Sequence, residues 1–160
     1  MNNGLLYLRL FLLMIFMSHT VHAAENMNFH GTLVTAPDCH INNDQIIEVA
    51  FGNVGVNKVD GVNYAKKINY AITCDGESTD ALYLSINGTS IDWNHAAVKA
   101  SADNLAIEIQ LAGQPFLLGS QVRVDLARLP VLTAVPVKKS GESLTAGDFT
   151  AEATLVAFYQ

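Results

Sequence analysis

GDFTAEATLVAFYQ, residues 147–160, closes the chain with its clearest strand pattern. One face of this segment carries Phe149, Ala151, Ala153, Leu155, Ala157 and Tyr159, which alternate with the other residues. Strict alternation is typical of a β-strand with one buried face. Because the pattern runs to within one residue of the end of the sequence, we expect the strand to have an unpaired edge. An apolar strand with such an edge aggregates unless another chain covers it.

Similar strand patterns recur along the preceding sequence at roughly ten-residue spacing. Strands are expected at residues 46–51, 68–74, 81–86, 105–111, 122–126 and 129–137. Asn87-Gly88 predicts a hairpin turn, and Pro130 and Pro136 favour an edge or irregular strand for the last of these segments. Only residues 95–101 are compatible with a short helix. The pattern predicts an all-β fold, an immunoglobulin-like β-sandwich of one domain.

A second unusual strand pattern, MNFHGTLVT, occupies residues 27–35 near the other end of the chain. Its apolar face carries Met27, Phe29, Gly31 and Leu33. A glycine on the apolar face packs nothing, and it indicates a place where the backbone approaches another element closely. The simpler alternative is that this segment and the last strand are ordinary strands of a closed sandwich.

The first 23 residues are expected to be a cleavable secretory signal. Arg9 precedes a short apolar run at residues 10–17, and small residues end the segment before position 24. The run is far shorter than the roughly 20 residues of a membrane-spanning helix, although an uncleaved anchor is an alternative. Export to an oxidising compartment favours a disulfide between Cys39 and Cys74 over two free thiols.

Composition excludes several classes of function. The chain has 160 residues, of which 50% are hydrophobic and 15% charged, and its formal net charge is −6. Such a chain buries enough apolar surface to fold, and it lacks the basic surface that nucleic acid requires. No nucleophile elbow, zinc-helix or phosphate-loop motif is present, so we expect no enzyme, no metal site and no cofactor. Trp93, between Asp92 and Asn94, could stack on a sugar, but partial burial is the commoner role of a loop aromatic.

Four segments in this order resemble a pilin subunit of the chaperone–usher pathway, of the type 1 and P pilus kind. They are NFHGTLVTAPDCHI (28–41), YAITC (70–74), LAIEIQLAGQPFLLG (105–119) and the closing GDFTAEATLVAFYQ. The closing segment is the most specific, because it places a glycine, Gly147, fourteenth from the end and a tyrosine, Tyr159, next to last. The sequence looks closer to minor subunits than to the abundant rod subunit.

The resemblance implies an incomplete immunoglobulin-like sandwich that lacks its final strand and is completed by a donor strand in trans. It divides the chain into a signal peptide (1–23), an N-terminal donor-strand extension (24–36) and a pilin domain (37–160). The implied donor residues are Met27, Phe29, Gly31 and Leu33. The implied groove and chaperone-binding residues are Gly147, Phe149, Ala151, Ala153, Leu155, Ala157, Tyr159 and Gln160.

The implied function is a structural subunit of a pilus that polymerises by donor-strand exchange and so contributes to adhesion. Its partners are then a periplasmic chaperone, an outer-membrane usher and neighbouring pilin subunits, and it travels through the periplasm to a fimbrium on the cell surface. Three alternatives stay open: a pilus chain terminator, a closed secreted module that binds carbohydrate or protein through its loops, and a periplasmic enzyme.

Overall fold

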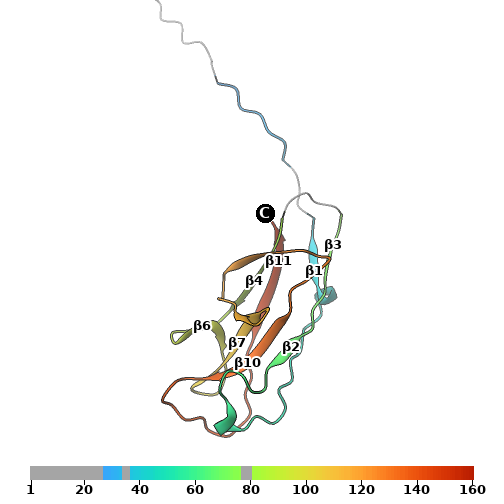
Figure 1. Ribbon diagram of the computed structural model, residues 1–160. Helices are drawn as coiled ribbons and strands as arrows, with labels where there is room; N and C mark the ends of the chain where they lie inside the picture. The colour runs from blue at the N-terminus through green and yellow to red at the C-terminus, as the bar shows by residue number, and fades with distance from the viewer. Residues whose placement is uncertain (1–26, 34–36, 77–80) are drawn as a thin grey trace, which may run out of the picture. The chain divides into compact units, whose positions relative to one another are not determined.

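The computed structural model describes residues 27–33, 37–76 and 81–160. The chain divides into two units, residues 1–34 and 35–160. The expected signal peptide, residues 1–23, lies outside the described residues. In its described residues, the second unit consists of strands and loops with two short 3-10 helices (Figure 1). Its elements are β1 (Cys39–Ile41), η1 (Asn42–Asp44), η2 (Val56–Lys58), β2 (Lys66–Ile68), β3 (Ile72–Cys74), β4 (Leu82–Gly88), β5 (Ser90–Ile91), β6 (Asn94–Lys99), β7 (Leu105–Leu111), β8 (Gln114–Pro115), β9 (Gln121–Val124), β10 (Leu132–Lys138) and β11 (Ala153–Tyr159).

These strands form three antiparallel groups. The largest sheet has the order β2-β10-β7-β6-β5, with β8 beside β7, and a smaller sheet has the order β11-β4-β9. The third group is the short pair of β1 and β3. Figure 1 shows β10 beside β7, and β11 beside β4.

The core lies between the two main sheets. From β4, the predicted inward residues Leu82, Leu84 and Ile86 are all buried. Ile86 packs in one cluster with Ile107 and Ile109 of β7, so side chains of opposite sheets meet there. Alternation therefore placed the buried faces correctly, and the predicted sandwich is confirmed.

The predicted strand at residues 68–74 is instead two strands in different groups. β2 pairs with β10, whereas β3 pairs with β1. Between them, Tyr70 packs against two core clusters, and its hydroxyl donates a 2.7 Å hydrogen bond to the carbonyl oxygen of Pro130. Burial raises the pKa of the Tyr70 hydroxyl above its ordinary value. Tyr70 thus anchors the chain at the point where it changes strand partners.

The predicted hairpin at Asn87-Gly88 is wrong. β4 continues through both residues, and Gly88 pairs with Ala153 of β11. A Cβ atom at position 88 would lie 2.5 Å from Cγ1 of Val98, so the glycine permits a close approach between the sheets rather than a turn. The hairpin lies further on, between β5 and β6, where Ile91 pairs with Asn94.

The short helix considered at residues 95–101 is also wrong, because this segment forms most of β6. Residues 96–98 are buried one after another, which a strand covered on both faces allows. The edge-strand interpretation of residues 129–137 is only partly right. β10 pairs with β2 as well as β7 over Leu132–Ala134, but Pro136 lies where only β7 is its partner, so its missing N–H breaks no second ladder.

Cys39 and Cys74 form the predicted disulfide. The two residues are direct cross-strand partners in the pair of β1 and β3. In residues 27–33, 37–76 and 81–160, no helix has the length and apolar character to cross a bilayer.

Candidate functional site: an open groove beside the last strand

β11 is hydrogen-bonded to a neighbouring strand on one side only. It pairs with β4 along its whole length, from Ala153↔Gly88 to Tyr159↔Leu82. β1 approaches β11, yet its ladder is with β3, and no strand of the described residues pairs with the other edge of β11. Backbone N–H and C=O groups along that edge are therefore available to a further strand.

The segment that faces this region, residues 45–55, belongs to no strand and has no ladder. The strand predicted at residues 46–51 is therefore wrong, since these residues form no sheet pairing. Val49 and Phe51 pack against the main core cluster, and the ring of Phe51 lies 6.0 Å from that of Phe149. Two apolar walls thus meet here, one from each end of the domain sequence.

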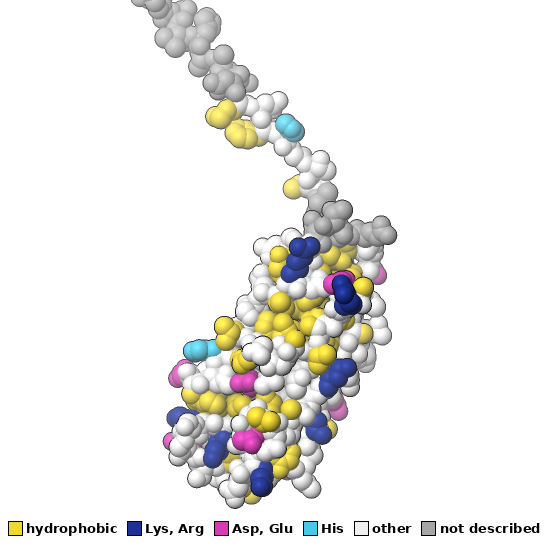
Figure 2. All heavy atoms as spheres, viewed as in Figure 1, with side chains coloured by type: hydrophobic (Ala, Val, Ile, Leu, Met, Phe, Trp, Pro, Cys, Tyr) yellow, Lys and Arg dark blue, Asp and Glu magenta, His cyan; other side chains and the backbone are white. Residues whose placement is uncertain are grey.

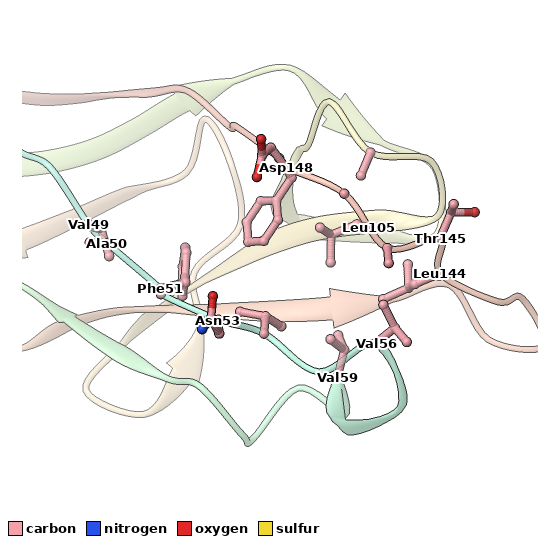
Figure 3. A pocket seen from close by; sticks show the side chains of 16 residues that line it. Val49, Ala50, Phe51, Asn53, Val56, Val59, Leu105, Leu144, Thr145 and Asp148 are labelled. Atoms are coloured by element: carbon pink, nitrogen blue, oxygen red, sulfur yellow. The ribbon is translucent and has the colours of Figure 1, made fainter.

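A cavity of about 540 Å³ lies between these walls (Figure 3). Figure 3 shows Leu105, Leu144, Val56 and Val59 converging at one end of it. Among the described residues, Asp148 is the one charged residue of its lining, which otherwise comes mostly from apolar side chains and backbone of residues 49–59 and 144–149. Such a lining suits apolar side chains of a bound segment. We call the cavity together with the free edge of β11 the acceptor groove.

Apolar side chains also gather over the middle of the face seen in Figure 2, in the region that β11 and β1 occupy in Figure 1. Lysine and arginine side chains lie at the margin of this area (Figure 2). Leu155, Ala157 and Tyr159 are half-buried and pack against a core cluster that includes Ile72 and Leu84. The arrangement leaves a strip of the core incompletely covered.

The structure brings together some of the residues predicted for the groove. Phe149 packs against two core clusters and lines the cavity, and Leu155, Ala157 and Tyr159 share the inward face of β11. Gly147 lines the cavity as well. Ala151 and Ala153 are exposed, and β11 begins at Ala153 rather than at the start of the predicted strand. Gln160 is exposed and exchanges two backbone hydrogen bonds with Ala81.

The segment of residues 27–33 belongs to the other unit. Its predicted apolar face is exposed, with relative exposures of 73% for Met27, 86% for Phe29 and 102% for Leu33. Gly31 has no heavy atom within 4 Å of where a Cβ would lie. The neighbouring residues 24–26 and 34–36 of the expected extension lie outside the described residues.

The model of the fimbrial protein family matches residues 27–160 of the chain. The chain belongs to this family. This fimbrial protein is 35% identical over 150 residues to the uncharacterized fimbrial-like protein YfcQ of Escherichia coli (strain K12), an alignment that covers 89% of this chain and 93% of YfcQ. It is 27% identical over 165 residues to the fimbrial adapter PapF of Escherichia coli, with 95% and 98% covered.

Two solved structures share the fold of this fimbrial protein. The P pilus rod subunit PapA superposes with a TM-score of 0.63 at 23% identity, covering 84% of this chain and 98% of PapA. The P pilus adaptor subunit PapF gives a TM-score of 0.58 at 23% identity, with 79% and 98% covered. The fold is the immunoglobulin-like sandwich that lacks a strand, and the protein is a pilus (fimbrial) subunit.

Sequence reasoning missed one wall of the acceptor groove. Val49, Phe51, Val54 and Leu144 pack beside Phe149 or line the cavity with it, but none of them was expected there. The available signal was an apolar run at residues 46–51. Such a run is equally compatible with a strand paired in a sheet and with the wall of an open groove. Only the pairing observed in the structure separates the two.

Proposed function

We propose that this pilus subunit polymerises by donor-strand exchange. Its acceptor groove takes a strand from another chain, first from a periplasmic chaperone and then from the extension of a neighbouring subunit. Its own residues 24–36 act as the donor extension for another subunit. The observation that carries the proposal is the unpaired edge of β11, together with an apolar cavity lined by residues 144–149 of the segment that leads into this strand.

The energetics support insertion of an extended segment. Main-chain hydrogen bonds to a sheet edge are nearly independent of sequence, and side-chain pockets select the partner. Met27, Phe29 and Leu33 are exposed, and burying each of them contributes roughly 1.5–3 kcal/mol before the cost of ordering the segment. An apolar groove left empty exposes its lining, so an uncompleted subunit is expected to aggregate.

The same proposal gives the route of the protein. Residues 1–23 direct export, the disulfide forms in the periplasm, and the chaperone delivers the subunit to an outer-membrane usher for incorporation into a surface fimbrium. There the role is structural, and the fibre contributes to adhesion. We assign the boundaries of the extension and of the pilin domain as residues 24–36 and 37–160.

Periplasmic co-expression with the cognate chaperone tests the groove. Leu155→Asp places a charge on the inward face of β11, where Leu155 packs against two core clusters. The matched control is Thr154→Asp, because Thr154 is the exposed neighbour on the same strand. We expect a one-to-one complex with the wild type and the control, and none with Leu155→Asp. Equal recovery of all three without chaperone would contradict the proposal.

A second experiment separates a polymerising subunit from a chain terminator. Peptides of residues 24–36 are added to chaperone-bound neighbouring subunits, and release of chaperone is followed by native electrophoresis. A donor peptide displaces the chaperone. If the peptide displaces chaperone from no neighbouring subunit, the chain is a terminator, and the proposal that its own groove accepts a strand is unaffected.

A further inference from the structure

A carboxylate occupies an unusual place on the outer face of the larger sheet. Glu108 lies on β7, and its cross-strand partners are Ala97 of β6 and Val135 of β10. Both neighbours are buried, with exposures of 0% and 1%, and they belong to a small apolar cluster on this face. Glu108 itself is only half-buried, so its carboxylate reaches the surface of the sheet beside this apolar cluster.

Two amide side chains hold this carboxylate in place. Nδ2 of Asn94 donates to one oxygen of Glu108 at 2.7 Å, and Nε2 of Gln110 donates to the other at 2.9 Å. Oδ1 of Asn94 in turn accepts from the amide of Ala96 at 2.9 Å. Each carboxylate oxygen can accept a second hydrogen bond, so a rigid pair of acceptor sites remains. Side chains fixed in this way bind a ligand without a large ordering cost.

The carboxylate opens into a cavity of about 400 Å³, which is near the lower end of the size range of small-molecule sites. One wall of this cavity is the half-buried indole of Trp93, which packs against the same apolar cluster. The remaining lining residues are Val59, Asp60, Gly61, Asn94, Val137, Lys138 and Ser140. An apolar ring beside a few convergent polar groups is the usual composition of a ligand pocket.

The polar groups of the cavity favour a ligand rich in hydroxyl donors. Asp60 is held in its own turn, because the amides of Val62 and Asn63 both donate to its Oδ1 at 2.9 and 2.7 Å, and Nδ2 of Asn63 donates to its Oδ2 at 2.7 Å. Only Oδ2 can accept one further hydrogen bond from a ligand. The hydrogen bonds within the turn, that from Asn63 first, lower the pKa of Asp60, which is therefore ionised at neutral pH. In the described part of the chain, no salt bridge involves Asp60, Glu108 or Lys138. Two carboxylates against one lysine disfavour an anionic ligand.

From this geometry we propose that the cavity formed by Trp93, Asn94 and Glu108 binds a neutral saccharide. The apolar face of a pyranose ring stacks on the indole of Trp93, and two neighbouring hydroxyls donate to the oxygens of Glu108. Lys138 and Ser140 supply donors at the rim. The site is independent of strand exchange and gives a structural subunit its own contact with glycans.

Calorimetric titration of the mature chain, in the complex in which it is isolated from the periplasm, tests the site. The probes are the methyl glycosides of mannose, galactose and N-acetylglucosamine, with sialyllactose as the anionic comparison. We expect at least one neutral glycoside to bind and sialyllactose to bind more weakly. Glu108→Gln keeps the shape of the side chain but removes its charge, so it should weaken binding about tenfold or more.

The matched control is Glu142→Gln, which makes the same change at an exposed residue outside the cavity and should leave binding unchanged. A melting curve of each variant separates loss of the site from loss of the fold. Trp93 is the only tryptophan of the chain, so its indole N–H resonance in an isotope-labelled subunit should shift on binding. No binding of any neutral glycoside, preference for sialyllactose, or equal affinity of Glu108→Gln and wild type would each overturn the proposal.

Discussion

Replacing Gly88 by alanine should destabilise the domain through a single identifiable contact. The new Cβ would lie 2.5 Å from Cγ1 of Val98 and 3.3 Å from the carbonyl oxygen of Glu152. Val98 cannot easily move, because it is 2% exposed and its β-branched side chain has few allowed rotamers. Overpacking of this kind in a filled core costs about 1–3 kcal/mol.

A double-mutant cycle isolates this contact. Val98→Ala alone removes two buried carbon atoms, which costs about 1.6 kcal/mol by transfer and more through the cavity left behind. In Gly88→Ala/Val98→Ala the clashing atom is absent, so the pair should cost at least ~1 kcal/mol less than the sum of the single changes. Residues in contact commonly show coupling of this size.

Urea denaturation of the four proteins, each with its acceptor groove filled by the same donor-strand peptide and followed by circular dichroism, measures the cycle. Gly147→Ala is the control, because a Cβ at position 147 meets nothing within 4 Å, and it should change stability by less than about 1 kcal/mol. Additive costs, agreeing within about 0.5 kcal/mol, would refute the close-approach explanation of Gly88. A strongly destabilised Gly147→Ala would show instead that these glycines act through backbone freedom.

Three further predictions concern the disulfide, Tyr70 and the extension. Cys39→Ser/Cys74→Ser opens a loop with a sequence separation of 35 residues, so the free energy of unfolding should fall by ~4 kcal/mol, and the wild type under reducing conditions should fall by the same amount in thermal melts. Burial raises the pKa of Tyr70, so the folded protein holds this proton more tightly than the unfolded chain, and stability should be constant below about pH 10 and fall as the pH rises through the folded-state pKa. Tyr70→Phe should reduce this loss of stability at alkaline pH, and it should cost about 1 kcal/mol at neutral pH because the hydrogen bond to Pro130 is removed. In the peptide of residues 24–36, Phe29→Ala should weaken displacement of chaperone roughly 10- to 150-fold, which is the equilibrium equivalent of losing one buried aromatic side chain, while His30→Ala on the other face should have little effect.

The parts of the fold that the sequence predicted are those in which a local pattern has one physical outcome. Leu82, Leu84 and Ile86 alternate and are buried, and the two cysteines are bonded to each other, as expected for a chain that is exported. The errors arose where one local sequence pattern is compatible with two different structures. The glycine of Asn87-Gly88 is as suitable for a close approach as for a turn, and only Val98, from another strand, decides between them.

The two candidate sites could be predicted from the sequence only where their residues share one strand. Leu155, Ala157 and Tyr159 could be assigned to a groove because they share one face of one strand. The opposite wall could not, since Phe51 meets Phe149 only after the chain has crossed both sheets. Trp93 and Glu108 are still harder to connect from sequence, because their cavity depends on the register of β6 against β7.

The position of the disulfide has a mechanical consequence for a fibre under tension. If subunits are linked through their extensions, a pulling force enters the domain through the chain that leads to Cys39, the first residue of β1. β1 has three residues and one strand partner, so without the disulfide its hydrogen bonds would break one after another under load. The bond from Cys39 to Cys74 passes the load to β3 before that short ladder bears it. β3 is as short as β1 and pairs with no other strand of the described residues, so the disulfide holds this pair of strands together where the fibre pulls on it.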